Sequence, residues 1–451
     1  MSNKELAGKI SEARRASLQL AQLSREVKDR ALRFAARAVL ERREDILDAN
    51  KKDMVAGRAL FELGKLPKPL LDRLKLDETK ILEISKMVDS VADLDDPVGK
   101  TLYAMKMDVG LELFKITVPF GVIVSIFESR PDALPQIASL CIKSGNSVLL
   151  KGGSEALESN RAVYRVMNEA FLAEGLPAGC MQLVEGRSVV SGLLKMEGLV
   201  DLIIPRGSNE FIRHIQENTE IPVLGHSSGI CHVYVDSAAD PKKAVEICHD
   251  ARVQYPAACN SMKIMLIHEK VAPDLLPKIA KRLVESGVRI KGCSRSLKII
   301  RSNGIPVEKA GDEDWSTEYL EMVLPVRVVG GVDEAIEHIN RYGSHHTDSI
   351  LSEDAAVVKN FLNMVDSSTV IHNASTRFSD GYRYGLGAEV GISTNKVHAR
   401  GPVGLEGLVT TKYILLGSGQ KVSDYVGKDA AHFLHEKGTA DWKGRLGAWR
   451  R

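Results

Sequence analysis

Short apolar runs alternate with helical patterns from residue 121 onward, and this alternation constrains the fold more than any other feature. The first four apolar runs cover residues 122–127, 147–150, 181–184 and 199–204. The helical patterns that follow them cover residues 133–143, 159–173, 188–196 and 209–218. Strands that alternate with helices form a parallel sheet with helices on both faces. Such sheets bind ligands at the carboxyl ends of their strands, so the sequence predicts a site at that edge.

A second alternation of the same kind runs from residue 232 to about residue 371. Its clearest elements are a strand at 326–329 and helices at 274–286, 332–342 and 354–365. A chain of 451 residues is too long for one simple core. Two α/β domains in series are therefore the simplest prediction.

The segments outside these alternations have a different character. Residues 5–55 carry apolar side chains at helical spacing, and helix continues to about residue 91 after Pro67 and Pro69. Residues 99–118 predict a β-hairpin that turns near Gly110. A glycine-rich segment, 381–407, precedes an apolar strand at 408–416. The polar residues after 416 predict a peripheral or mobile tail.

Composition excludes several classes of protein. The net charge is +2 with acids and bases interspersed, so no strong field would attract nucleic acid. No apolar run reaches membrane-spanning length, and the N-terminus lacks the apolar segment of a signal peptide. The six cysteines are scattered without a CxxC pair, which predicts neither a zinc site nor a disulfide framework. Reduced thiols without an export signal predict a cytoplasmic protein.

The segment 254–263, QYPAACNSMK, is the strongest candidate for catalysis. Cys259 follows Pro256 and two alanines, between a helical pattern at 241–252 and an apolar run at 264–267. Small neighbours leave the sulfur open, and loops on a rigid scaffold often carry catalytic groups. A thiolate is the attacking form, so local positive charge or backbone N–H donors are expected beside it. The competing interpretation is a buried structural thiol.

Two turns after predicted strands are candidates for nucleotide binding. Lys151-Gly152-Gly153-Ser154 follows the run at 147–150, and Gly207-Ser208 follows the run at 199–204. Glycine permits close backbone approach, and the N–H groups of a helix starting near Asn209 suit a pyrophosphate. The alternative for each is an ordinary strand-to-helix turn. The near match GLGAEVG at 385–391 lacks a preceding strand, so it is not a dinucleotide fingerprint.

Histidines and arginines give weaker signals. His345 and His346 are adjacent and face different ways on a strand, and no third ligand is placed, so the sequence predicts no metal site. Arg377, Arg383 and Arg400 lie in polar, glycine-rich stretches. Such arginines either clamp an anionic substrate or are ordinary surface charges.

Taken together, these segments resemble the aldehyde dehydrogenase superfamily, and within it the gamma-glutamyl phosphate reductase family. The likeness covers residues from about 5 to 416, and the tail after 416 has no clear counterpart in the short members of the family. The runs around Cys259 and at 399–408 are the most specific. The matching runs are 127–131, 145–153, 205–210, 225–236, 256–260, 338–344 and 399–408.

The resemblance implies an aldehyde dehydrogenase-like α/β fold with four parts. These are an NADP-binding domain (1–98 and 119–236), a catalytic domain (237–403), an oligomerisation flap (99–118 and 404–416) and a tail (417–451). It implies NADPH-dependent reduction of L-glutamyl 5-phosphate to L-glutamate 5-semialdehyde through a Cys259 thioacyl intermediate, in proline biosynthesis. It also implies a homodimer or higher homo-oligomer, with glutamate 5-kinase as a candidate partner.

The same resemblance implies roles for individual residues and no metal. Cys259 is the nucleophile, and backbone N–H groups near Cys259 and Asn260 stabilise the oxyanion. The residues implied to hold the cofactor are Lys151, Gly152, Ser154, Gly207, Ser208 and Glu318. The residues implied to hold the substrate are Arg130, Arg377 and Arg400.

Several assignments stay open. Glu321 competes with Glu318 for the nicotinamide ribose. The asparagine usual in the oxyanion site is missing, and either Glu128 or Ser129 occupies its neighbourhood. Ser154 stands where NAD-preferring relatives often carry a glutamate, which favours NADPH, although the adjacent Glu155 weakens that inference.

Two other functions compete with the reductase. A hydrolytic NAD(P)-dependent aldehyde dehydrogenase needs a carboxylate to activate water, and the corresponding stretch 224–229, LGHSSG, has none. His226 is its one candidate base. A non-catalytic scaffold on the same fold is disfavoured by the Cys259 loop and by the two glycine turns.

Overall fold

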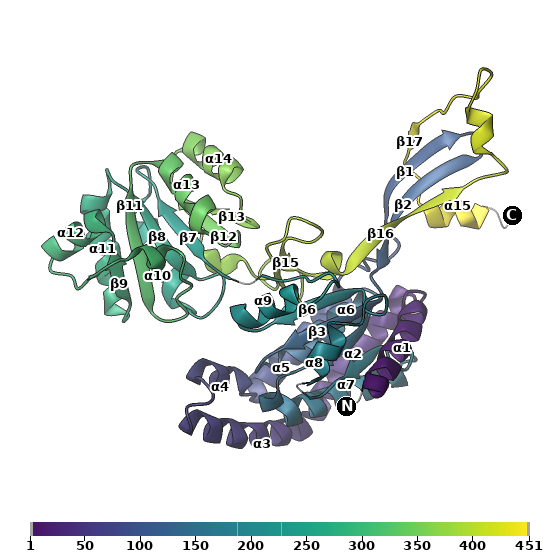
Figure 1. Ribbon diagram of the computed structural model, residues 1–451, viewed down its shortest axis with the longest axis horizontal. Helices are drawn as coiled ribbons and strands as arrows, with labels where there is room; N and C mark the ends of the chain where they lie inside the picture. The colour runs from purple at the N-terminus through teal and green to yellow at the C-terminus, as the bar shows by residue number, and fades with distance from the viewer. Residues whose placement is uncertain (1–2, 187, 227, 449–451) are drawn as a thin grey trace. The chain divides into compact units, whose positions relative to one another are not determined.

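The structure is a computed structural model and describes residues 3–186, 188–226 and 228–448 (Figure 1). The chain divides into two compact units. Unit 1 comprises Met1–Ile204, Thr219–Pro222 and Gly404–Arg451, and unit 2 comprises Pro205–Asn218 and Val223–Val403. The four-part division implied by the family resemblance stays a prediction.

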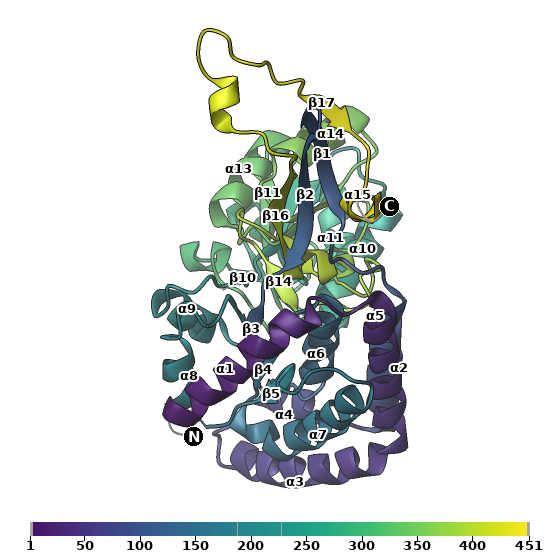
Figure 2. The ribbon, with the colours of Figure 1, turned by 90° about the vertical axis from the view of Figure 1, so that its right-hand side faces the viewer.

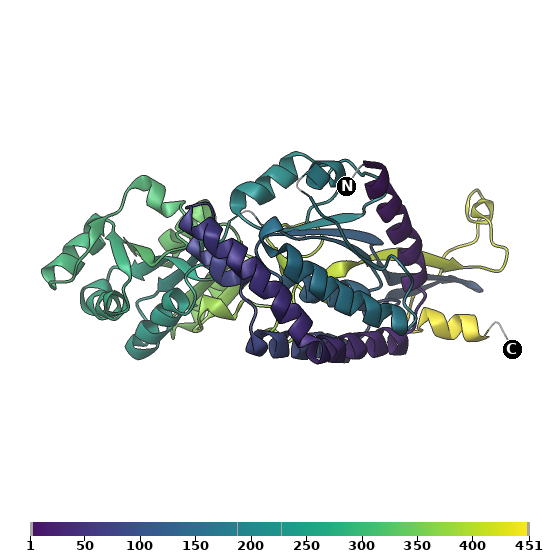
Figure 3. The ribbon, with the colours of Figure 1, turned by 90° about the horizontal axis from the view of Figure 1, so that it is seen from below.

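Unit 1 begins with the helices that the apolar spacing predicts. They are α1 (Asn3–Leu20), α2 (Arg25–Glu41), α3 (Arg43–Glu62), α4 (Lys68–Leu74) and α5 (Glu78–Asp93). The Asp77 side chain caps α5 by accepting the Lys80 backbone N–H at 3.0 Å. Helices α2 and α3 pack against α7 (Leu157–Ala173), and the three lie together in Figure 3.

A four-stranded sheet lies at the centre of unit 1, in the order β5-β4-β3-β6. Its strands are β3 (Val122–Phe127), β4 (Ser147–Lys151), β5 (Met181–Leu183) and β6 (Leu202–Arg206). Helix α1 packs across β3, β4 and β5 (Figure 2). The connecting helices are α6 (Ala133–Lys143), α7 and α8 (Ser188–Leu193). The predicted parallel pairing is confirmed for β3 with β4 and for β4 with β5.

An antiparallel sheet extends unit 1, in the order β16-β2-β1-β17. Strands β1 (Thr101–Asp108) and β2 (Leu111–Pro119) confirm the predicted hairpin, and Gly110 supplies a positive φ of 72° at its turn. Strand β16 (Val409–Leu416) pairs with β2. The predicted tail adds β17 (Glu436–Gly438) to β1 and the helix α15 (Trp442–Ala448). The described part of the tail is therefore folded onto this sheet.

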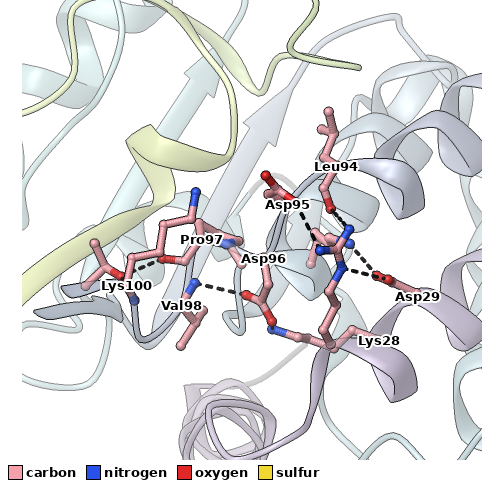
Figure 4. A network of polar contacts seen from close by, with 12 residues as sticks. Lys28, Asp29, Leu94, Asp95, Asp96, Pro97, Val98 and Lys100 are labelled. Carbon is pink, nitrogen blue, oxygen red and sulfur yellow. Dashed lines mark hydrogen bonds and ion pairs between the residues drawn. The ribbon is translucent and has the colours of Figure 1, made fainter. Parts of the chain in front are cut away.

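A buried lysine joins α2 to the segment that leads into this sheet (Figure 4). The Lys28 side chain is 1% exposed, and its ammonium lies 2.5 Å from the Asp96 carboxylate. The same carboxylate accepts the Val98 backbone N–H at 2.9 Å. Burial lowers the pKa of Lys28, and Asp96 opposes that effect by favouring the charged ammonium. This ion pair fixes the start of the hairpin on the helical layer.

Unit 2 contains a seven-stranded sheet in the order β10-β9-β11-β8-β7-β12-β13, parallel at every pairing described. The strands are β7 (Cys231–Val235), β8 (Met262–His268), β9 (Arg289–Gly292), β10 (Glu308–Lys309), β11 (Val323–Val329), β12 (Thr347–Leu351) and β13 (Thr369–His372). The predicted second α/β alternation is thus confirmed. The outer strands β9, β10 and β13 and the polar strand β12 have no long apolar run, so the sequence pattern missed them.

Helices cover both faces of this sheet (Figure 1). One core lies beneath α10 (Pro241–Val253), α11 (Ala272–Glu285) and α12 (Ser294–Ser302), and it includes Val233 and Met265 from the strands. The opposite core lies beneath α13 (Val332–Tyr342) and α14 (Ala355–Met364), and it includes Tyr234 and Ile264. Adjacent residues of one strand therefore enter different cores, as the period of two requires.

The remaining segments of unit 2 are short. Helix α9 (Asn209–Glu217) follows β6, and the glycine-rich segment forms a small ladder of β14 (Gly391–Ser393) and β15 (Gly401–Val403). Within the described ranges, no helix combines the length and apolar character needed to cross a membrane.

Candidate active site

Cys259 lies on the predicted loop, between the end of α10 and the start of β8. Lys263 on β8 holds this loop through three hydrogen bonds. Its fully buried ammonium donates to Pro256 O at 2.7 Å, to Ala258 O at 2.8 Å and to Ser261 Oγ at 2.5 Å. All three ammonium protons are used, so the loop backbone is fixed around the thiol.

Two histidines flank the Cys259 sulfur. His346 Nε2 lies 3.1 Å from Sγ, and donor atoms of His226, Cys259 and His346 all lie within 4.8 Å of one another. The two imidazole rings meet edge to face, with centroids 4.9 Å apart. His226 Nδ1 contacts Ile392 O at 2.9 Å, and His346 Nδ1 contacts Thr347 Oγ1 at 2.8 Å. These contacts orient each ring with its Nε2 edge available to the sulfur.

Strand order explains why these three residues meet. Cys259 precedes β8, His226 precedes β7 and His346 precedes β12, and the sheet places these strands side by side as β8-β7-β12. The site of unit 2 therefore lies at the amino ends of its parallel strands. The carboxyl-end rule was applied to the first sheet, and this cluster does not follow it, because Cys259, His226 and His346 lie on loops that enter neighbouring strands rather than on loops that leave them.

The histidines change the ionisation of Cys259. Burial alone would raise the pKa of the thiol, but the nearby charges of His346 and His226 outweigh burial and hold the pKa well below its usual value. Burial lowers the pKa of His226, whereas the Cys259 thiolate raises it, and the thiolate prevails. By contrast, burial raises the pKa values of Cys180 and Cys248 to about 12. The arrangement favours an imidazolium–thiolate pair.

Gly229 allows the segment that leads into β7 to lie directly against the Cys259 backbone. A Cβ atom at this position would lie 2.5 Å from Cys259 O and 2.6 Å from its Cα. No side chain fits there without moving the loop. Beside this contact, the Cys231 thiol donates to Cys259 O at 3.1 Å. Ser227, which belongs to the matching run 225–236, lies outside the described residues.

The Asn260 side chain joins the Cys259 loop to the segment near residue 379. Its amide Nδ2 donates to Ser379 O at 2.7 Å, and the side chain is 4% exposed. The amide hydrogens therefore face the protein rather than a substrate. A contribution of Asn260 to the oxyanion site through its backbone N–H stays a prediction.

The three predicted substrate arginines have different hydrogen-bond partners. Arg377 is nearly buried, donates from Nε to Gln254 Oε1 at 2.7 Å and stacks over Tyr255 at 5.8 Å, so it lies beside the Cys259 loop. Arg400 instead pairs with Asp366 at 3.0 Å. Arg130 lies in unit 1 and pairs with Asp132 at 2.8 Å.

Arg383 extends the positive group around Arg377. Its Nη1 donates to Arg377 O at 3.3 Å, and burial together with the Arg383 charge lowers the pKa of Arg377. Two neighbouring guanidinium groups at the border of the Cys259 loop favour an anion there.

The predicted cofactor residues of unit 2 lie close together. Gly207 and Ser208 precede α9, and Ser208 caps this helix by accepting the Phe211 N–H at 3.3 Å. Asn209 Nδ2 donates to Glu318 Oε2 at 2.7 Å. The turn and Glu318 are therefore neighbours, although Glu318 is far away in the sequence.

The predicted cofactor residues of unit 1 follow β4. Lys151 is the last residue of that strand, its Nζ donates to Gly152 O at 2.9 Å, and Ser154 begins a short 3-10 helix. Glycine is required at 152, because a Cβ there would lie 2.1 Å from Asn160 Nδ2.

The Glu128–Ser129 neighbourhood belongs to the same unit. Ser129 donates its backbone N–H and its hydroxyl to Glu155 Oε1 at 2.7 and 2.6 Å. Ser129 holds a left-handed φ of 40°. The structure ties Ser129 to Glu155 and leaves the choice between Glu128 and Ser129 open.

Sequence reasoning missed the pairing of His346 with Cys259, the close approach of Gly229 and the Lys263 clamp. His346 was considered only as a metal ligand beside His345. The left-handed φ of 58° at His345 separates the two histidines, and His345 Nδ1 contacts Asp366 O at 2.6 Å instead. The available signal was the position of a histidine directly before a strand.

Comparison with known proteins decides the family. The aldehyde dehydrogenase family model matches residues 1–290. A gamma-glutamyl phosphate reductase of Methanosarcina acetivorans is 49% identical over 96% of this chain and 97% of its own length. One of Pelotomaculum thermopropionicum is 51% identical over 98% and 99%. The chain belongs to the gamma-glutamyl phosphate reductase family, within the aldehyde dehydrogenases. Its members are oxidoreductases, so the chain is an enzyme.

Solved structures agree with this assignment. The gamma-glutamyl phosphate reductase of Thermotoga maritima is 39% identical, covers 92% of this chain and 99% of its own, and superposes with a TM-score of 0.87. An acetylating aldehyde dehydrogenase of Geobacillus thermoglucosidasius, 18% identical with a TM-score of 0.65, shares the fold. The aldehyde dehydrogenase-like fold is thus confirmed, and NAD(P) is the cofactor class of this family. The 98% coverage by the Pelotomaculum reductase also means that the tail has a counterpart in that relative.

Proposed function

We propose that this gamma-glutamyl phosphate reductase family member reduces L-glutamyl 5-phosphate to L-glutamate 5-semialdehyde and phosphate, with NADPH as reductant, in cytoplasmic proline biosynthesis. The observation that carries the proposal is the Cys259 thiol held between His226 and His346 in unit 2. An activated thiolate can attack the carbonyl carbon of an acyl phosphate and displace phosphate.

The chemistry at Cys259 proceeds through two bond exchanges. The thiolate attacks the acyl carbonyl, a C–S bond forms, the C–O bond to phosphate breaks, and phosphate leaves with the electron pair. NADPH, when bound, supplies a hydride. The thioester carbon accepts that hydride, the C–S bond then breaks, and the aldehyde leaves while the sulfur regains its thiolate. Backbone N–H groups near Cys259 and Asn260 stabilise the carbonyl oxygen, at about 3 kcal/mol for a good donor.

His346 and His226 serve the sulfur at both exchanges. The His346 Nε2 contact at 3.1 Å stabilises the thiolate before attack and again when sulfur becomes the leaving group. His226 is held by Ile392 O through Nδ1, so its Nε2 edge stays toward the same sulfur. Both residues contact the reacting atom and are therefore proposed as catalytic.

Cofactor preference is proposed from the turn after β4. Ser154 is small and neutral at the position where NAD-preferring relatives often carry a carboxylate, and Lys151 adds positive charge. The Glu155 carboxylate, which argues against this inference, accepts two hydrogen bonds from Ser129 and lies at the same turn, where a Cβ at Gly153 would be 2.0 Å from its Oε1. We expect kcat/KM to be higher with NADPH than with NADH, and Ser154→Glu to reduce that preference. Equal use of both cofactors by the wild type would contradict this reading.

The remaining cofactor residues are proposed from the family resemblance. They are Gly152, Gly207, Ser208 and Glu318. The Asn209–Glu318 hydrogen bond supports Glu318 over Glu321, because it holds the Glu318 carboxylate at the start of α9.

For the substrate, the observations favour Arg377 among the three predicted arginines, since it lies beside the Cys259 loop with Arg383 attached. Arg130 and Arg400 stay predictions, and each is already paired with an aspartate. A homo-oligomer built through the flap, with glutamate 5-kinase as a partner, completes the proposal.

A specific observation keeps the hydrolytic alternative in view. Burial raises the pKa of Glu389 to about 7, and this carboxyl interacts electrostatically with Cys259. Its Oε2 accepts the Gly381 N–H at 2.8 Å. A carboxylate with a pKa near neutrality is suited to activate water, which is the group that the stretch 224–229 lacks.

The deciding experiment measures NADPH formation from glutamate semialdehyde and NADP⁺, with and without inorganic phosphate. The proposal requires phosphate dependence and acyl phosphate as product. Losing a general base typically costs about 10²–10⁴ in rate, so water should lose to phosphate. Rapid phosphate-free turnover to glutamate, abolished by Glu389→Gln, would establish the hydrolytic function instead.

A further inference from the structure

We propose that Cys259, His226 and His346 form a three-donor site that binds Zn²⁺, and that the bound ion reversibly blocks the nucleophile. Binding of the ion stands on geometry alone, whereas inhibition rests on the proposed function. The sequence predicted no metal at this place, because it considered His346 only with its neighbour His345.

The donor atoms are already gathered. The sulfur and the two imidazoles offer one ligand atom each, all within 4.8 Å of one another, and the His346 Nε2–Sγ separation is 3.1 Å. Zn²⁺ takes sulfur at about 2.3 Å and imidazole nitrogen at about 2.0–2.1 Å, which puts tetrahedral donors about 3.5 Å apart. Shifts of about 1 Å therefore convert the hydrogen-bonded cluster into a coordination site.

The groups behind the two rings have the pattern of metal-ligating histidines. A histidine that binds a metal through one ring nitrogen usually hydrogen-bonds a protein oxygen through the other. His226 Nδ1 contacts Ile392 O at 2.9 Å, and His346 Nδ1 contacts Thr347 Oγ1 at 2.8 Å. Both rings are thereby held with Nε2 directed toward the sulfur and need no rotation to bind.

The donor set selects the ion. One thiolate and two imidazoles suit borderline-soft Zn²⁺, and the triad contains no carboxylate that would favour Mg²⁺ or Ca²⁺. Three protein donors leave a fourth position for water. Cys259 and His226 are partly exposed, so an ion can reach the cluster from solvent. Coordination draws electron density from the thiolate and places the ion beside the sulfur, so the ion-bound enzyme should form the thioester far more slowly.

Co²⁺ is the probe for binding, because Zn²⁺ has a filled d shell and no d–d spectrum of its own. Titration of the full chain in buffer free of thiols and chelators should give one thiolate-to-cobalt charge-transfer band and tetrahedral d–d bands at one ion per chain. Added Zn²⁺ should displace them. Cys259→Ser should abolish the charge-transfer band, and His226→Asn and His346→Asn should each weaken binding by at least about tenfold.

Two matched variants control for other ligands. His345→Asn removes the adjacent imidazole while asparagine tolerates the left-handed backbone at that position, and Cys293→Ser removes another partly exposed thiol. Both should bind Co²⁺ as the wild type does. A band that survives Cys259→Ser, or one that disappears in either control, would place the ion elsewhere and overturn the proposal, as would the absence of any band.

Inhibition is measured separately from binding. Stoichiometric Zn²⁺ should remove turnover of the semialdehyde with NADP⁺ and phosphate, and EDTA should restore it. Cobalt binding without any measurable turnover in metal-free enzyme would reject the proposed function and leave the metal site standing. Full activity with the cobalt band present would reject the blocking role.

Discussion

The two α/β units use opposite edges of their parallel sheets. In unit 1 the predicted nucleotide turn begins at Lys151, the last residue of β4. In unit 2 the Cys259 cluster stands before β7, β8 and β12, at their amino ends. The general preference for carboxyl ends agrees with the predicted nucleotide turn and does not describe the position of the Cys259 cluster. Which ends of the strands carry a site therefore depends on which connecting loops of that sheet hold the reactive side chains.

The units also differ in the use of a buried lysine. In unit 1 the Lys28 ammonium is paired with the Asp96 carboxylate and joins two structural elements. In unit 2 the Lys263 ammonium has only neutral oxygens as hydrogen-bond acceptors, and burial lowers its pKa to about 8. The first arrangement serves folding, and the second shapes the loop of the nucleophile.

The largest effect is expected at the sulfur of unit 2. Cys259→Ser should reduce kcat by at least about 10⁴-fold, because a hydroxyl beside the same histidines is not ionised at neutral pH. Cofactor affinity, measured by fluorescence titration, should stay near that of the wild type. Cys293→Ser is the matched control, and it should retain most activity. Full activity of Cys259→Ser would show that Cys259 is not the nucleophile.

The next effect tests the histidine contact. His346→Asn should lower kcat by about 10²–10³-fold with little change in the KM for NADPH, since it removes the group that stabilises the thiolate. His345→Asn, one residue away, should leave kcat unchanged. Steady-state kinetics of the pair measure this difference. Similar losses in both variants would mean that the segment matters only for folding.

In unit 1 the expected effect is on stability. Asp96→Asn leaves the buried Lys28 ammonium without its hydrogen-bonded counter-charge and should cost about 3 kcal/mol in the free energy of unfolding. Lys28→Met combined with Asp96→Asn should recover most of that loss, because no uncompensated charge remains. Urea unfolding of the three variants measures both values. Equal stability of the single variant and the wild type would contradict a structural role for the pair.

In unit 2 the matching stability effect depends on pH. Burial raises the pKa of Glu389 from 4.5 to about 7, despite the opposing charge of Arg206. The folded state therefore holds a proton that the unfolded state loses, so stability falls as pH rises from about 4.5 to 7 and stays lower above it. Glu389→Gln should stabilise the protein by about 3 kcal/mol at pH 8 and by well under about 1 kcal/mol at pH 4.5. Thermal unfolding at both pH values checks the sign.

The smallest effect is expected at the nucleotide turn of unit 1. Lys151→Met should raise the KM for NADPH by about tenfold, the equivalent of one charge-assisted contact, with little change in kcat. Steady-state kinetics with varied NADPH measure it. A large fall in kcat without a change in KM would mean that Lys151 acts on the reaction and not on binding.

Local patterns predicted much of the fold. The bounds of β3, α6 and α13 coincide with the predicted segments, because long apolar periodicity marks them clearly. Strand β12, with the sequence TDSIL, was missed because its buried polar residues are satisfied by partners far away in the chain. Asp348, for example, accepts the His232 backbone N–H at 2.7 Å.

The site was predicted only in part, for a related reason. The small neighbours of Cys259 and its place between a helical pattern and an apolar run indicate a candidate nucleophile on a loop. Its pairing with His346 follows from the adjacency of β8, β7 and β12, which no local pattern encodes. The need for glycine at 229 depends on a contact with Cys259 O, and this too becomes visible only in the folded chain.

Strand β17 has a consequence for the behaviour of the protein at high concentration. It covers Ala104, Met105 and Lys106 of β1, at the margin of the β16-β2-β1-β17 sheet. Unpaired strand margins are templates on which further chains add, one after another, into fibres or amorphous precipitate. By adding β17, the chain replaces the long margin of β1 with a strand of only three residues, of which Glu436 and Lys437 are charged. Short, charged edge strands are poor templates for further strands, so we expect the tail to favour solubility.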